Sequence, residues 1–158
     1  MSDIVAPRGL TLLSVAALAY AGAATVASVV SVRHDVPGRP FGISAGMDVP
    51  AALAVGWGSG IAPPWPMPAA ALVAASRARW GHRRAAALAA TIGACSIVGH
   101  AIEPVTWRRR EWTPLGVAAA TTMLAASVAL VVAGAATYRS MPRVERVIVA
   151  EPTTREPS

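Results

Sequence analysis

Long apolar stretches separated by short polar clusters form the main pattern of this chain. Three of these stretches contain no Asp, Glu, Lys or Arg and lie at residues 10–32, 85–102 and 114–138. Because a helix of about 17–25 residues crosses the hydrocarbon core of a bilayer, each is long enough to span it. The pattern therefore predicts three membrane-spanning helices.

A further apolar stretch, residues 48–76, is interrupted near its middle. It contains no basic residue, but between Gly56 and Pro68 the sequence is GWGSGIAPPWPMP. Closely spaced prolines cannot continue a helix, and a break at membrane depth needs its backbone groups buried in protein or facing a water-filled cavity. We expect a discontinuous or kinked second span, and a re-entrant segment that does not cross is the alternative.

Together these stretches predict an all-α integral membrane protein, a four-transmembrane-helix bundle over residues 1–138. Residues 139–158 are polar and hold three prolines, which predicts a largely disordered cytoplasmic tail. The first stretch also permits another interpretation, a signal peptide cleaved near Ala21. Because the apolar run continues well past that residue, we expect a retained helix.

Small residues fall on one side of three of the expected helices, and in residues 85–102 this side holds Ala89, Gly93 and Ser96. Such stripes let helix backbones approach closely in a membrane, either within one chain or against a partner subunit or second copy. On a 100° wheel the first stripe comprises Ala17, Ala21, Ala24, Ser28 and Ser31, and that of the last helix comprises Ala118, Thr122, Ala125, Ala129 and Ala136.

Composition supports a membrane protein and argues against nucleic-acid binding. The chain is 54% hydrophobic and 14% charged, with a net charge of +6. Its basic residues are all arginines and cluster beside apolar stretches, where anionic lipid headgroups and membrane orientation account for them. We expect contact with anionic lipid through Arg77, Arg79, Arg83 and Arg84, and the Ala-, Gly- and Arg-rich usage indicates a bacterial inner-membrane protein.

The arginines also predict an orientation. With four spans, nine of the fourteen arginines lie on the side of the two termini, so the positive-inside rule places both termini in the cytoplasm. If residues 48–76 do not cross, ten arginines become cytoplasmic and the N-terminus lies outside. In both topologies Arg108–Arg110 remain an external exception to the rule.

His100 and Glu103 are the main candidates for chemistry. They are three positions apart on the helical face that also holds Ala89, Gly93 and Ser96, and ionisable residues at membrane depth suggest a function. If the first loop supplies His34, Asp35 or Asp48, the group can bind a divalent metal or relay protons. The alternative, which we favour, is that His100 and Glu103 are anchors at the membrane interface.

Two tryptophans flank the proline-rich break. Trp57 and Trp65, together with Asp48, are candidates to line a pocket for a flat apolar ligand such as a quinone. The lone Cys95 excludes an intramolecular disulfide, and the chain contains no GxxxxGK[ST], GxGxxG, HExxH or GxSxG motif. No cofactor is expected.

These features favour a structural or interaction subunit of the membrane without catalysis. A membrane oxidoreductase or other enzyme acting on an apolar substrate is the first alternative, with His100 and Glu103 at the mouth of its pocket. A small proton-coupled transporter that uses Glu103 or Asp48 is the second.

Overall fold

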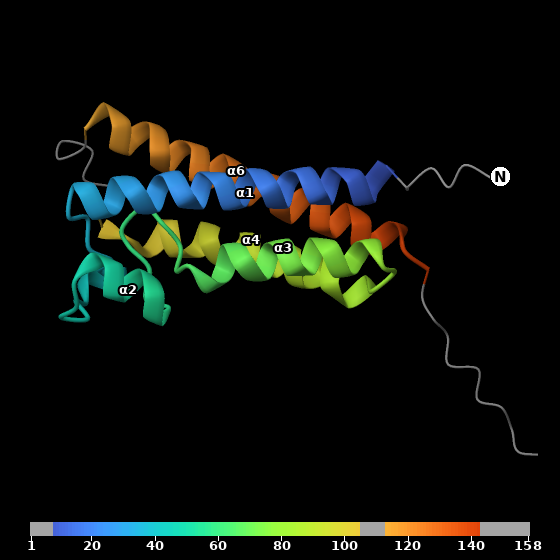
Figure 1. Ribbon diagram of the computed structural model, residues 1–158, viewed down its shortest axis with the longest axis horizontal. Helices are drawn as coiled ribbons and strands as arrows, with labels where there is room; N and C mark the ends of the chain where they lie inside the picture. Colours follow the sequence, from blue (N-terminus) through green and yellow to red (C-terminus); the bar gives the residue numbers. More distant parts are fainter. Residues whose placement is uncertain (1–7, 105–112, 143–158) are drawn as a thin grey trace, which may run out of the picture.

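The computed structural model describes residues 8–104 and 113–142 (Figure 1). Within these ranges the chain is helical and has no strand, apart from an isolated bridge between Pro37 and Ser59. The prediction of an all-α chain is confirmed to that extent.

Three helices are long and apolar enough to cross a membrane among the described residues. They are α1 (Arg8–Arg33), α4 (Arg83–Ile102) and α6 (Pro114–Ser140), close to the predicted stretches. Helix α6 begins as its sequence suggests, because Pro114 occupies the first turn and the Thr113 side chain accepts a hydrogen bond from the Gly116 N–H at 3.1 Å.

The interrupted stretch forms two separate helices, α2 (Val49–Val55) and α3 (Pro66–Arg79). Gly56 ends α2 in the left-handed region at φ 103°, which favours glycine, and residues 56–65 contain no helix. Helix α3 has 14 residues, so it extends about 21 Å at 1.5 Å per residue. That length is too short for α3 to cross a bilayer core alone.

Helices α1, α3, α4 and α6 lie side by side along the long axis of the molecule (Figure 1). Helix α1 packs against α3 and α6, and α4 packs against the same two helices. The start of α1, the turn between α3 and α4, and the end of α6 lie at one end of the molecule. The short helix η1 (Pro40–Gly42) and α2 lie at the opposite end.

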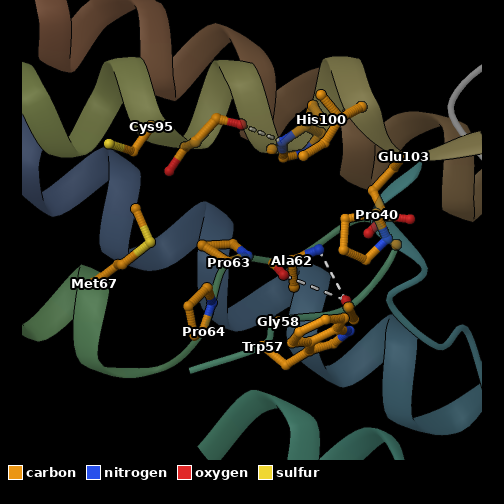
Figure 2. A pocket seen from close by; sticks show the side chains of 15 residues that line it. Pro40, Trp57, Gly58, Ala62, Pro63, Pro64, Met67, Cys95, His100 and Glu103 are labelled. Carbon is orange, nitrogen blue, oxygen red and sulfur yellow. Dashed lines mark hydrogen bonds between the residues drawn. The ribbon is translucent and has the colours of Figure 1, made fainter. Parts of the chain in front are cut away.

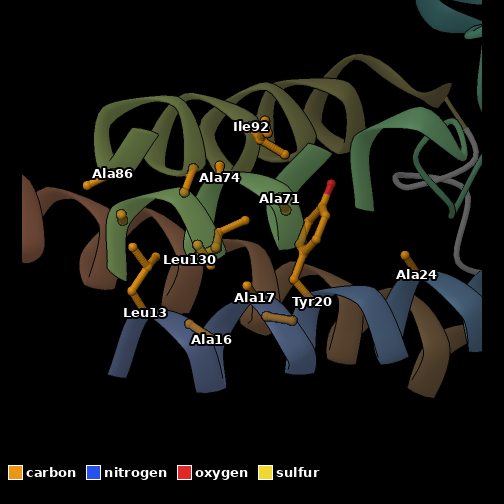
Figure 3. Packing of buried hydrophobic residues seen from close by; sticks show 14 of the residues in the cluster. Leu13, Ala16, Ala17, Tyr20, Ala24, Ala71, Ala74, Ala86, Ile92 and Leu130 are labelled. Atoms are coloured by element: carbon orange, nitrogen blue, oxygen red, sulfur yellow. The ribbon is translucent and has the colours of Figure 1, made fainter. Parts of the chain in front are cut away.

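The core between these helices consists mostly of alanine, with Leu13, Tyr20 and Leu130 as its larger members (Figure 3). The stripe predicted for α1 is confirmed, since Ala17, Ala24, Ser28 and Ser31 are buried and Ala21 is half-buried. Alanine keeps the interhelical distances short, so packing relies on close backbone approach.

The stripe predicted for α6 does not pack within the chain. All five of its residues are exposed, and the buried face consists of Ala119, Ala120, Met123, Ala126, Ser127, Leu130, Gly134 and Thr137. Two glycines at the crossing with α4 select this face. A Cβ on Gly93 would lie 2.7 Å from the Ser127 carbonyl oxygen, and one on Gly134 would lie 2.8 Å from the Ala86 carbonyl oxygen. Small residues occur on every side of α6, so their presence alone does not identify the buried side.

Candidate functional site

A cavity of about 180 Å³ lies between the break that separates α2 from α3 and the last turns of α4 (Figure 2). We call it the break cavity. Trp57, Pro63, Pro64 and Met67 lie on one side of it, and His100 lies across from them on α4 (Figure 2). Its full lining is Pro40, Trp57, Gly58, Ser59, Gly60, Ala62, Pro63, Pro64, Met67, Cys95, Ser96, Gly99, His100, Ile102 and Glu103.

Glu103 follows the last residue of α4 and joins that helix to the loop after α1. Its two carboxylate oxygens accept hydrogen bonds from the backbone N–H of Arg39, at 3.1 and 3.0 Å. The side chain is 6% exposed. Burial raises the pKa of Glu103 above its ordinary range, and the Arg39 hydrogen bond, which favours the charged form, offsets only part of that rise.

His100 is buried, and only one of its two ring nitrogens has a partner. Nδ1 lies 2.9 Å from the Ser96 carbonyl oxygen, and because a carbonyl can only accept, the geometry assigns the proton to Nδ1. Nε2 is buried without a hydrogen-bond partner among the described residues. In the neutral ring this nitrogen is an acceptor that no described residue uses.

Ser96 connects this region to α1 through its side chain. Its hydroxyl lies 2.5 Å from the hydroxyl of Tyr20, which is fully buried in the middle of α1. Sequence reasoning did not select Tyr20 as a site residue. The sequence did contain a signal for it, because Tyr20 places one phenol hydroxyl within the long apolar stretch 10–32. A buried tyrosine hydroxyl usually forms a hydrogen bond, so a polar partner was to be expected.

The break itself is fastened to the end of α1. The hydroxyls of Ser31 and Ser59 lie 2.7 Å apart, and the Ser59 hydroxyl accepts from the Ala62 N–H at 2.9 Å. Gly38 approaches closely as well, because a Cβ there would lie 2.9 Å from the Gly58 carbonyl oxygen. The Ser59 hydroxyl thereby satisfies the Ala62 N–H, a backbone group in the break that lies outside any helix.

We compared the chain with protein-family models, curated proteins and solved structures. Nothing matched in any of the three comparisons.

The predicted pair of tryptophans is divided between two sites. Trp57 lines the break cavity together with His100 and Glu103, and its Nε1–H donates to the Gly38 carbonyl at 3.1 Å. Trp65 lines a separate apolar groove of about 490 Å³ between α1 and the start of α3. Its Nε1 lies 3.3 Å from the Ser28 hydroxyl, to which it donates.

The first-loop candidates do not join His100 and Glu103. Asp48 is exposed and caps α2, where its side chain accepts from the Ala51 N–H at 2.8 Å. His34 and Asp35 are exposed. Within residues 8–104 and 113–142 no group of three or more His, Cys, Asp or Glu side chains is close enough to hold a metal ion.

The arginine cluster lies at the end of the bundle away from the break cavity. The Arg83 guanidinium stacks 3.6 Å from the ring centroid of Tyr138 and donates through Nε to the Tyr138 carbonyl at 3.0 Å. Arg77, Arg79 and Arg84 are exposed. Arg108–Arg110 lie outside the described residues, as does most of the predicted tail.

Proposed function

We propose that this protein is a small multi-pass inner-membrane protein with a structural or interaction role and no catalysis of its own. In this proposal α1, α4 and α6 cross the membrane, and residues 48–76 provide a fourth, discontinuous crossing. The packing of α3 between α1 and α4 supports the fourth crossing, because α3 runs beside two proposed spans to the end of the bundle where α1 begins.

One observation supports the proposal that the protein has no catalytic activity. Five candidate side chains already have a partner within the chain, although Nε2 of His100 has none among the described residues: Glu103 binds Arg39, His100 binds Ser96 through Nδ1, Asp48 binds Ala51, Trp57 binds Gly38 and Trp65 binds Ser28. Four of these five contacts are made with the backbone. Such contacts position loops and helix ends, whereas a catalytic acid or base needs access to a reacting group.

The interaction role predicts a companion in the membrane, either a second copy or another membrane protein. Native mass spectrometry of the full chain in mild detergent tests it directly. We expect a dimer or a complex with another chain, unchanged by Glu103→Gln. A strictly monomeric chain that carries no companion would contradict the interaction role.

Contact with anionic lipid belongs to the same proposal. Arg77, Arg79 and Arg84 are exposed at one end of the bundle and are available to phosphate headgroups, whereas Arg83 is engaged with Tyr138. In the same mass spectra we expect bound anionic phospholipid, reduced when these three arginines are changed to Gln. If the protein retained zwitterionic and anionic lipid equally, the proposed contact with anionic lipid would be contradicted.

A second candidate function is an enzyme that acts on an apolar substrate such as a quinone. It is favoured by the shared lining of the break cavity, where Trp57, His100 and Glu103 meet. A bound quinone or other chromophore in the purified protein, together with turnover that His100→Gln abolishes, would support this candidate over the non-catalytic role.

A further inference from the structure

The apolar groove of about 490 Å³ beside Trp65 shares no lining residue with the break cavity. Helix α1 supplies most of its lining, between Ala24 and Arg33. The remainder is Pro50 on α2, Trp65 before α3 and Pro68 on α3. We call this hollow the α1 groove.

The α1 groove is open to the surroundings of the bundle, because three of its lining side chains are nearly half exposed. Val29 is 45% exposed, Val32 43% and Trp65 47%. The groove follows the second half of the candidate membrane span Leu10–Arg33. Ten helical residues rise about 14 Å, and half of a hydrocarbon core of about 30 Å has nearly the same depth. Where α1 crosses the membrane, the lipid chains of one leaflet therefore reach this groove.

The polar side chains inside the α1 groove are engaged with the protein itself. The Thr25 hydroxyl donates to the Ala21 carbonyl at 2.9 Å. The Ser28 hydroxyl accepts from the indole N–H of Trp65 at 3.3 Å. The surface that remains is mainly apolar, and burying it against a hydrocarbon chain is favourable without any further polar contact.

The only charged residue of the lining lies at one end of the α1 groove. Arg33 is the last residue of α1, its side chain is exposed, and it forms no ion pair within residues 8–104 and 113–142. No acid lines the groove, since neither Asp35 nor Asp48 is part of it. The groove thus complements a negative charge at the end of the span, where lipid phosphates lie, and offers nothing to an ammonium group. An apolar channel that ends at a cation matches an acyl chain that ends at a phosphate.

We infer that the α1 groove binds one anionic phospholipid, with an acyl chain against α1 and Trp65 and with the phosphate paired to the guanidinium of Arg33. The site lies at the opposite end of the bundle from Arg77, Arg79 and Arg84, so it is distinct from the lipid contact proposed above. The inference rests on the proposed crossing of α1, but it requires neither a companion chain nor that other contact.

The test titrates the full chain in mild detergent with phosphatidylglycerol and with phosphatidylcholine of the same acyl chains. Native mass spectrometry measures the bound lipid. Arg33→Gln is expected to weaken phosphatidylglycerol binding about fivefold, the effect of one basic residue at a membrane surface, and to leave phosphatidylcholine binding unchanged. Arg39→Gln is the matched control, because Arg39 is exposed at the same end and does not line the groove.

The same titrations with Arg77, Arg79 and Arg84 changed to Gln separate the two lipid contacts. Failure of the contact proposed above appears as unchanged lipid binding when these three arginines are replaced. Failure of the groove site appears as unchanged phosphatidylglycerol binding when Arg33→Gln is added to that background.

Filling the α1 groove tests the acyl chain separately from the phosphate. Val29→Trp places a large ring in the lining and should weaken the binding of both lipids. Val26→Trp is the control, because Val26 is 53% exposed on α1 outside the lining, and it should leave both unchanged. If Val29→Trp does not fold, Arg33→Gln at the exposed helix end still decides the question.

Three results would overturn the inference. The first is equal phosphatidylglycerol binding by the unaltered chain, Arg33→Gln and Arg39→Gln. The second is unchanged lipid binding in a folded Val29→Trp variant. The third is a companion chain, in place of lipid, that is lost from Val29→Trp, because the groove would then be a protein interface.

Discussion

The carboxylate of Glu103 receives the backbone N–H of Arg39 between its two oxygens, at 3.1 and 3.0 Å, across 64 positions of sequence. This contact attaches the loop that follows α1 to the end of α4. It also closes one side of the break cavity, because Glu103 and Pro40, the residue after Arg39, both line that cavity. A residue expected to carry chemistry or to anchor at the interface thus organises the loop that connects α1 to α2.

Removing this carboxylate is expected to destabilise the fold. Glu103→Ala leaves the Arg39 N–H without its acceptor and should lower the free energy of unfolding by about 1.5–3 kcal/mol, the range for hydrogen bonds to charged groups. Glu103→Gln should cost less, because its amide oxygen can still accept. Thermal unfolding in detergent measures both changes. Asp35→Asn, which removes an exposed charge in the same loop and suits the left-handed backbone there (φ 48°), is the control, and an equal loss there would contradict the role of the Glu103 contact.

The raised pKa of Glu103 gives stability a defined pH dependence. Burial makes the folded state bind this proton more tightly than the unfolded state does. Linkage then makes the stabilising contribution complete below the unfolded pKa of about 4.3 and removes it as pH rises through the folded pKa. Melting temperatures measured from about pH 4 upwards should show this decline in the unaltered chain and lack it in Glu103→Gln. Identical profiles for the two proteins would refute the assignment.

Two glycines provide a matched test of helix packing. Gly93→Ala places a Cβ 2.7 Å from the Ser127 carbonyl oxygen, and this overpacking should lower stability by about 1–3 kcal/mol. Gly22→Ala on α1 meets no atom within 4 Å, so it should cause no loss. The difference in unfolding free energy between the variants measures the α4–α6 contact. If both are tolerated equally, α4 and α6 do not approach at Gly93.

The proposed orientation predicts opposite accessibility at the two ends of the bundle. In a Cys95→Ala background, Ser44→Cys should react with a membrane-impermeant maleimide in intact cells, because the loop after α1 is external in the four-span topology. Ser140→Cys, at the end of α6, should react only after the membrane is opened. Ser44 and Ser140 are both exposed in the fold, and Ser140 is the last residue of α6. Labelling of both from the same side would contradict the topology.

Much of the helical pattern could be predicted from sequence because it depends on local order. The length of the uncharged stretches predicted α1, α4 and α6. Helical periodicity placed Ser96, His100 and Glu103 on one face, and all three are buried, although α4 ends at Ile102 and Glu103 follows it. The cap at Asp48 was not predicted, although an aspartate before a proline-containing helix start is a known N-terminal signal. These properties involve only neighbouring residues.

The contacts that build the break cavity could not be predicted in the same way. Glu103 with Arg39, Tyr20 with Ser96, and Ser31 with Ser59 join distant positions, and no periodicity specifies such pairs. The sequence also did not indicate which side of α6 is buried within the chain, for another reason. Its small residues surround the helix, and the side that packs is set by the close approach of Gly93 and Gly134 to the opposite backbone.

The central claim is that the break between α2 and α3 packs into the bundle and forms one side of the cavity opposite His100. The pair Ser31 and Ser59, with hydroxyls 2.7 Å apart, reports this packing most directly. In a Cys95→Ala background, Ser31→Cys combined with Ser59→Cys should form an intramolecular disulfide on mild oxidation in native membranes, which peptide mapping identifies. Ser31→Cys combined with the exposed Ser44→Cys is the control and should not crosslink comparably. Failure of the 31–59 pair to form a disulfide, while both cysteines remain reactive to maleimide, would contradict the packing of the break against α1.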